Sequence, residues 1–452
     1  MRRGLVWGSL ALTACLASAS LLARRAWSAP PHETQPAAST TAVPLVPLVL
    51  AQAHPVVEDG GAGEESPPVH REASRLAGLD LTRITFDDGA PTATVTAGSA
   101  RLTLDGELQR TAGKLMAERH FPEASVVLME TATGRLLVYA SHVERPPARD
   151  LCAEATAPSA SVFKIVTASA LVEDAGLGPD TPQCYLGGEQ RITAADLVED
   201  PARDRWCTTL GGALGRSINT VFARLARKYL APKDLDAMAR RFGYGSPVPF
   251  DLPVQPSGVH VPDEPLEFAR TAAGFWNTTL SPLQAAEISA IVARRGESVR
   301  PRVVDSVVTP AGTPLWSAPS GSSGSRVIAP ETADKVGAMM EQTVRGGTCF
   351  RAFHDARGAT FLPGVSVAGK TGTLSDGRAE RYYTWFTGFA PSRPIEGTPT
   401  VAIAVLVVNG PVWREKANVL AREILRAYFA ERSVPGVTRP ALGSIARRKP
   451  RP

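Results

Sequence analysis

Apolar positions recur along the middle of the chain with two different periods. Two apolar runs in ASVVLMETATGRLLVYAS flank Thr133 and Gly134, which predicts a β-hairpin. From Ser161 to about Arg295 the spacing is mostly helical and is broken by glycine and proline. Strand patterns return in GVSVAGKTGTL, YTWFTGFAP and TVAIAVLVVNG, and a closing helix is expected from about Glu415 to Ala430.

Strands at both ends of the domain, with helices between them, predict an α+β fold. We expect a central antiparallel β-sheet built from both ends of the domain, flanked by helices and carrying an inserted, mainly helical lobe. The expected organisation is an anchor or signal at 1–25, a disordered Pro/Ala-rich tether at 26–75, a short segment at 76–104, the folded domain at 105–430 and a disordered basic tail at 431–452.

The first 25 residues, MRRGLVWGSLALTACLASASLLARR, predict export. A basic start precedes an uncharged run from Gly4 to Ala23 that is long enough to cross a bilayer. Three fates fit this pattern: an uncleaved anchor, cleavage after Ala19, or lipidation at Cys15 in LTAC. We favour the anchor, and all three place the folded domain on the extracytoplasmic side of the inner membrane.

Charge and histidine content narrow the function classes. The chain has 49 basic and 44 acidic residues, scattered along its length apart from the basic end IARRKPRP, and no aromatic–basic motif of the nucleic-acid modules. We therefore expect no nucleic-acid partner. The seven histidines show no ligand spacing, so the sequence predicts no metal and no cofactor.

A lysine interrupts the apolar stretch APSASVFKIVTASAL. Residues three apart share a helix face, so Lys164 can fold back onto Ser161. Burial weakens the hold of a lysine on its proton, and such a lysine can act as a base toward a serine hydroxyl. The S-x-x-K pattern alone would arise by chance in about half of such chains, so other motifs must decide.

Two further motifs follow in the chain. SIN, Ser217 to Asn219, stands at an expected helix start, where Ser217 could simply cap the helix. KTGT, Lys370 to Thr373, stands in an expected strand, where it could be an ordinary turn at the strand end. The three motifs in this order and setting would arise by chance in roughly one chain in a thousand.

With these motifs the chain resembles the penicillin-binding transpeptidases, which belong with the serine β-lactamases to one acyltransferase superfamily. The resemblance extends over roughly Leu102 to Phe429 and includes LTLDGELQRTAGKLM, ALGRSINTVFARLA, LSPLQAAEISAIVARRG and WFTGFAP. It implies the fold shared by penicillin-binding transpeptidases and β-lactamases.

The resemblance also implies catalytic roles. Ser161 would attack the carbonyl between the two D-alanines of a peptidoglycan stem peptide, and Lys164 would take its proton. Ser217, helped by Lys370, would relay a proton to the leaving amine. An amine of a neighbouring strand would then resolve the acyl-enzyme into a cross-link.

Four residues would bind the substrate on the same grounds. Asn219 would bind the substrate amide, and Thr371 and Thr373 would hold the terminal carboxylate. The N–H groups of Ser161 and Thr373 would form the oxyanion hole. Gly372, without a side chain, would let the substrate lie along the strand edge.

Several features of other superfamily members are absent from this chain, and their absence distinguishes between the possible enzyme classes. GSPVPFDLPVQPSG lacks the glutamate of the E-x-x-L-N motif in class A β-lactamases, so rapid β-lactam hydrolysis is not expected. A class D β-lactamase would normally have valine where Asn219 stands. There is no room for a glycosyltransferase domain before residue 100, and about 30 residues, Ala77 to Leu104, could serve as a pedestal.

The leading hypothesis is therefore a membrane-tethered, monofunctional, class B-like D,D-transpeptidase. Its expected partners are peptidoglycan stem peptides, β-lactams as covalent inhibitors, and a membrane glycan polymerase. A D,D-carboxypeptidase and a non-catalytic penicillin-binding sensor or wall-binding module remain as alternatives.

Besides Cys15 the chain has four cysteines, which allow three pairings in an oxidising compartment. Cys184 and Cys207 lie between the first two motifs in a Gly- and Pro-rich stretch, and several members of the resembled family have cysteines in a similar place. We expect a disulfide between them. Cys152 and Cys349 would then pair by elimination or remain as two free buried thiols.

Overall fold

The computed structural model describes residues 76–86, 91–188, 191–319 and 324–441. The predictions for residues 1–75 and 442–452, including the anchor and the tether, lie outside these ranges. None of the helices in the described ranges has both the length and the apolarity of a membrane span.

Five antiparallel strands form the main sheet, as the sequence predicted. Their order is β11 (Ala368–Asp376), β12 (Arg381–Ala390), β13 (Val401–Asn409), β3 (Glu123–Glu130) and β4 (Leu136–Val143). The strands β3 and β4 come from the start of the domain and the other three from its end. The predicted hairpin joins β3 to β4, and Gly134 in its turn has a φ of 72°, a left-handed conformation that favours glycine.

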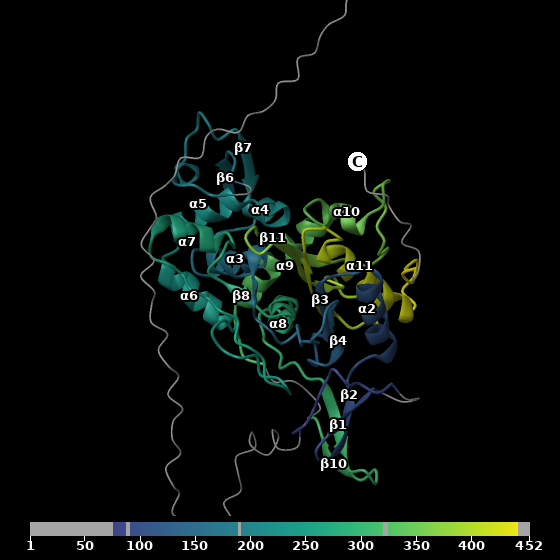
Figure 1. Ribbon diagram of the computed structural model, residues 1–452. Helices are drawn as coiled ribbons and strands as arrows, with labels where there is room; N and C mark the ends of the chain where they lie inside the picture. Colours follow the sequence, from purple (N-terminus) through teal and green to yellow (C-terminus); the bar gives the residue numbers. More distant parts are fainter. Residues whose placement is uncertain (1–75, 87–90, 189–190, 320–323, 442–452) are drawn as a thin grey trace, which may run out of the picture. The chain divides into compact units, whose positions relative to one another are not determined.

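Helices cover both faces of this sheet (Figure 1). The central strand β13 is buried throughout, so its two sets of alternating side chains face two different apolar clusters. Its odd-numbered residues from Val401 to Val407 pack with α2 (Gly106–Glu118) and α11 (Ala417–Glu431). Its even-numbered residues from Ala402 to Val408 pack in the cluster that contains α3 (Lys164–Glu173), α8 (Pro282–Ala293) and α9 (Pro330–Arg345).

The inserted lobe is mainly helical, as expected. It comprises α4 (Leu210–Arg216), α5 (Asn219–Tyr229), α6 (Pro232–Arg241), α7 (Pro265–Ala272), the 3₁₀ turn η2 (Ala194–Leu197) and the ribbon of β6 (Pro182–Tyr185) and β7 (Trp206–Thr209). Within this helical region, α4 and α5 are separate helices, because Ser217 between them adopts a left-handed conformation with φ = 60°.

A second, smaller sheet was not predicted. Its order is β1 (Thr92–Val95), β2 (Gly98–Leu102), β9 (Val304–Val308) and β10 (Pro314–Ser317), with antiparallel pairing throughout. The short segment before the domain therefore pairs with strands that follow the helical lobe. The remaining elements are the two-residue strands β5 (Ala157–Pro158) and β8 (Thr279–Leu280), the 3₁₀ turn η1 (Ala160–Phe163) and the short helix α10 (Phe350–Phe353).

Candidate active site

Ser161 and Lys164 lie at the start of the buried helix α3. The first turn, η1, is a 3₁₀ turn rather than the α-helix that the sequence predicted, and α3 begins at Lys164. The expected contact is nevertheless present, because the Lys164 Nζ lies 2.8 Å from the Ser161 Oγ. Ala160, just before the serine, has the left-handed φ of 48° that is uncommon outside glycine.

Lys164 is fully buried and its amine has two further polar neighbours. Asn219 Oδ1 lies 2.6 Å and the Ala273 carbonyl oxygen 2.5 Å from Nζ. Burial lowers the pKa of Lys164 well below its usual value, and the nearby Lys370 lowers it further. The Lys164 amine, in contact with a serine hydroxyl, therefore gives up its proton more readily than an exposed lysine does.

Ser217 and Asn219 reach this site from the junction of two helices. Ser217 is the residue that ends α4, and Asn219 is the first residue of α5. The alternative interpretation of Ser217 as an N-terminal cap is wrong, since the residue at that position is Ile218 and no side chain caps the helix. The left-handed backbone at Ser217 instead separates the two helices and leaves its hydroxyl beside the second lysine.

That second lysine, Lys370, comes from strand β11 and is also fully buried. Its Nζ donates to the Ser217 Oγ at 2.8 Å and to the Thr371 carbonyl oxygen at 2.8 Å. Burial lowers its pKa from 10.5 to about 7. The site thus contains two serine–lysine pairs: Ser161 with Lys164 at the start of α3, and Ser217 of the helical lobe with Lys370 of the main sheet.

The residues after Lys370 lie on an edge strand of the main sheet, since β11 pairs within that sheet with β12. A hydrogen bond of 2.6 Å joins the hydroxyls of Thr371 and Thr348. A Cβ on Gly372 would lie 3.1 Å from the Ala160 Cβ and 3.2 Å from the Trp385 Cβ. Glycine at this position therefore allows β11 to approach the turn that carries Ser161.

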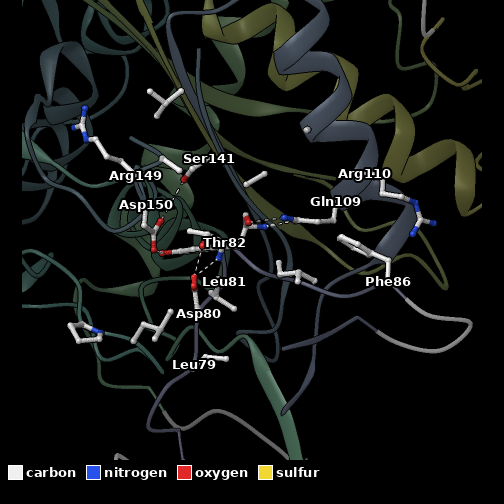
Figure 2. Close-up of a pocket in the computed structure, with 18 residues that line it drawn as sticks. Leu79, Asp80, Leu81, Thr82, Phe86, Gln109, Arg110, Ser141, Arg149 and Asp150 are labelled. Carbon is white, nitrogen blue, oxygen red and sulfur yellow. Dashed lines mark hydrogen bonds between the residues drawn. The ribbon is translucent and has the colours of Figure 1, made fainter. Parts of the chain in front are cut away.

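Two cavities of about 200 and 1120 Å³ meet at these residues, because Ser161, Asn219 and Thr373 line both of them. Together they form a cleft that residues of all three motifs line. Figure 2 shows a different cavity, of about 630 Å³, between the segment from Leu79 to Phe86 and strand β4. Its described lining residues include none of the motif residues.

Several supporting residues were missed by the sequence analysis. Gly274 follows α7 with φ = 76°, and a Cβ there would lie 2.3 Å from the Ala160 carbonyl oxygen. No sequence pattern singles out this glycine, because its contact with the Ser161 turn depends on the tertiary structure. The indole of Trp385 donates to the Pro158 carbonyl oxygen at 2.9 Å and fixes the same turn to the sheet.

Arg224 on α5 is a second missed residue. The Arg224 side chain is 3% exposed and donates two hydrogen bonds to the carboxylate of Asp204, whose side chain is 5% exposed. It also donates to the carbonyl oxygens of Cys184, Asp196 and Val198. Arg224 therefore ties the loop before α4 to the helix that begins with Asn219.

The structure contains the expected disulfide between Cys184 and Cys207, which are paired residues of β6 and β7. It does not contain the second pairing. Cys152 and Cys349 are both buried and free, and they belong to different apolar clusters on opposite faces of the main sheet. Burial raises the pKa of both thiols, so they are protonated at neutral pH.

A serine in contact with a buried lysine, together with a second serine–lysine pair beside the same cleft, is the arrangement expected of a serine acyltransferase. Residues 124–430 match the family model described as the penicillin binding protein transpeptidase domain. The chain belongs to this family. The predictions of family and fold are thus confirmed.

Individual relatives agree with this assignment. The chain is 31% identical over 272 residues to the peptidoglycan D,D-transpeptidase PbpA of Mycobacterium tuberculosis, covering 56% of this chain and 50% of the relative. It is 25% identical over 332 residues to the stage V sporulation protein D of Bacillus subtilis, covering 68% of this chain and 49% of the relative. The chain therefore spans about half the length of these curated relatives.

Among solved structures, penicillin-binding protein A of M. tuberculosis in its ceftriaxone acyl-enzyme complex aligns with a TM-score of 0.58 and 26% identity. The alignment covers 73% of this chain and 79% of the other.

Among the described residues, no group of three or more His, Cys, Asp or Glu side chains is placed so that it could hold a metal ion.

Proposed function

We propose that the protein is a peptidoglycan D,D-transpeptidase that forms an acyl-enzyme at Ser161. The observation that carries the proposal is the contact between the Ser161 hydroxyl and the buried amine of Lys164 at 2.8 Å, opposite the second pair of Ser217 and Lys370. Family membership and the names of the relatives support the same activity.

The neighbours of Lys164 suit the role of a base. A neutral amine has two N–H donors and one lone pair. Asn219 Oδ1 and the Ala273 carbonyl oxygen are acceptors without a hydrogen of their own, so each takes one N–H. The lone pair then faces the Ser161 hydroxyl. As the serine oxygen attacks the carbonyl between the two D-alanines, its proton passes to Lys164 Nζ.

The tetrahedral intermediate collapses when the amide C–N bond breaks and the leaving D-alanine takes a proton. Ser217 supplies this proton, and the Lys370 ammonium group, whose Nζ lies 2.8 Å from the Ser217 oxygen, replaces it and becomes a neutral amine. The amine of a second stem peptide then attacks the acyl-enzyme and passes its proton through Ser217 to Lys370. The new amide bond forms as the ester bond to Ser161 breaks, and Lys164 returns its proton to the Ser161 oxygen.

We also propose substrate-binding roles for the other motif residues that line this cleft. Thr371 and Thr373 on the edge strand would bind the terminal carboxylate, and Asn219 the substrate amide. The N–H groups of Ser161 and Thr373 would stabilise the oxyanion. Gly372 would let the substrate lie along the strand edge, and a side chain there would also press on Ala160 and Trp385.

The assay that tests this function gives purified protein a D-Ala-D-Ala pentapeptide with and without an amine acceptor. We expect D-alanine release and a cross-linked product in the presence of the acceptor. Release of D-alanine without cross-linking would identify a carboxypeptidase, and acylation without turnover a penicillin-binding sensor.

We further propose that the protein is tethered to the inner membrane by its N-terminus, with the catalytic domain outside the cytoplasm and a membrane glycan polymerase as partner. The basic and apolar composition of residues 1–25 supports this arrangement. In cell fractionation the full chain should be found with the membrane, and a chain beginning at residue 76 should be soluble and still react with penicillin. Loss of penicillin binding in the shorter chain would contradict the proposed domain boundary.

A further inference from the structure

The smaller of the two active-site cavities ends at the N-terminus of helix α11. Thr348, Thr371 and Thr373 line it from one side, and Lys416 and Asn418 line it from the helix. Among the described residues that line this cavity, Lys416 is the charged one. The three motifs account for neither Lys416 nor Asn418, and the sequence analysis singled out neither.

The helix end itself favours negative charge. The helix α11 has 15 residues, and the side chain of its N-cap residue, Lys416, does not cap it. The Ala417 N–H donates to the Thr384 hydroxyl at 3.1 Å, so the first turn points its positive dipole end toward strand β12 and the cavity beside it. A carboxylate placed here would be stabilised both by the helix and by the lysine.

Asn418 provides an independent sign of a ligand. Its side chain is 5% exposed, and its Oδ1 has no hydrogen-bond partner among the described residues. The Nδ2 donates to the sulfur of Cys349 at 3.6 Å, a weak acceptor. An unpaired buried amide atom is destabilising, and half a turn of the amide would present an N–H donor to the cavity instead. A bound carboxylate would satisfy that donor.

An aromatic side chain holds Lys416 at this place. The Lys416 Nζ lies 5.9 Å from the centre of the Trp413 ring, which is within the range of a cation–π contact. The Trp413 ring in turn meets Tyr382 edge-on at 5.8 Å. Tyr382 lines the larger cavity of the cleft. Trp413 therefore lies between Lys416 and a residue that lines the larger cavity.

The other lysines of the site are less suited to attract an anion. Lys164 and Lys370 are both fully buried, and burial lowers the pKa of each. The hydroxyls of Thr371 and Thr373 can hydrogen-bond a carboxylate but bring no charge. Lys416, by contrast, is exposed at the mouth of the cavity.

We propose that Lys416 and Asn418 complete the subsite that binds the terminal carboxylate of the substrate, and that Lys416 makes acylation selective for ligands with a free carboxylate. This proposal rests on the proposed acyltransferase function. The carboxylate would lie between the hydroxyls of the edge strand and the N-terminus of α11, with the scissile carbonyl at Ser161.

The test compares two acylating ligands that differ in one charge, benzylpenicillin and its methyl ester. Second-order acylation rates are measured for the wild type, Lys416→Met and Lys416→Arg, with Lys335→Met on α9 as the matched control. In Lys416→Met we expect the rate with benzylpenicillin to fall about tenfold or more, while the rate with the ester stays within about twofold. Lys416→Arg should restore most of the preference for the acid, and Lys335→Met should keep it.

An unchanged ratio of acid to ester rates in Lys416→Met would overturn the proposal. An equal fall in both rates would also overturn it, because it would indicate a structural effect on Ser161. Asn418→Asp gives a second check at the helix end, since a new carboxylate there should repel the acid and spare the ester. If the wild type reacts with neither ligand, this result would refute the proposed acyltransferase function, and the proposed carboxylate subsite would be refuted as well.

Discussion

Replacement of Gly274 by alanine should slow acylation although this residue contains no reacting group. Gly274 has φ = 76°, and holding an alanine in this left-handed region costs about 1–2 kcal/mol. The new Cβ would also lie 2.3 Å from the Ala160 carbonyl oxygen and 3.0 Å from the Ser161 Cα, against ordinary contacts of 3.4 Å or more. The turn carrying Ser161 must therefore move by about 1 Å, and a misplacement of this size can cost about 100-fold in rate.

Gly176 is the matched control, because it follows α3 with φ = 68° and has nothing within 4 Å of the position of a Cβ. Gly176→Ala should lose about 1 kcal/mol of unfolding free energy and keep the wild-type acylation rate. Gly274→Ala should lose about 3 kcal/mol from strain and contact together. Denaturant unfolding measures the unfolding free energy of each variant, and the rate of labelling by a fluorescent penicillin measures its acylation rate. Equal acylation rates in the two variants would refute the argument that Gly274 positions Ser161.

Three further predictions concern stability. Burial depresses the pKa of Lys370 to about 7, so between pH 7 and about 10 the unfolded chain holds a proton that the folded one has lost. Unfolding free energy should therefore rise with pH in this window, and Lys370→Met should reduce the slope by about 1.4 kcal/mol per pH unit. Replacing both Cys184 and Cys207 by serine should cost about 3 kcal/mol, because the disulfide spans a sequence separation of 23 residues. Arg224→Met should cost about 3 kcal/mol, because it leaves the Asp204 carboxylate unpaired at a site where both side chains are nearly buried.

Each of these predictions has a specific contrary result. The Lys370 argument fails if the variant and the wild type have the same pH slope between pH 7 and 10. Unchanged unfolding free energy in the double serine variant would show that the disulfide does not constrain the unfolded chain. For Arg224, the control is Arg227→Met, an exposed position on the same helix, and equal losses in the two variants would contradict the proposed role of the buried pair.

The sequence predicted the main sheet well because its strands carry strong local patterns. The buried run from Val401 to Asn409 and the hairpin around Gly134 are recognisable without tertiary information. The small second sheet could not be predicted in the same way. Its strands β1 and β10 have four residues each, and their pairing depends on contacts between segments far apart in the chain.

The site was predictable to the extent that residue types and spacing define it. Ser161 and Lys164 are close in sequence, so helix geometry alone brings them together. Gly274, Arg224 and Lys416 have no comparable signal. Each of them lies on an element that reaches the site only when the whole domain is packed. A helix start was expected at Ser217 to Asn219, but the left-handed conformation of Ser217 was not, because tertiary structure imposes a conformation that serine does not favour.

Intact-protein mass spectrometry after reaction with benzylpenicillin, followed by peptide mapping, tests the central claim most directly. We predict one covalent adduct per chain, located at Ser161, that is absent in Ser161→Ala and forms more slowly by orders of magnitude in Lys164→Ala. An adduct at a different serine, or one that forms undiminished in Ser161→Ala, would contradict the assignment of Ser161 as the nucleophile.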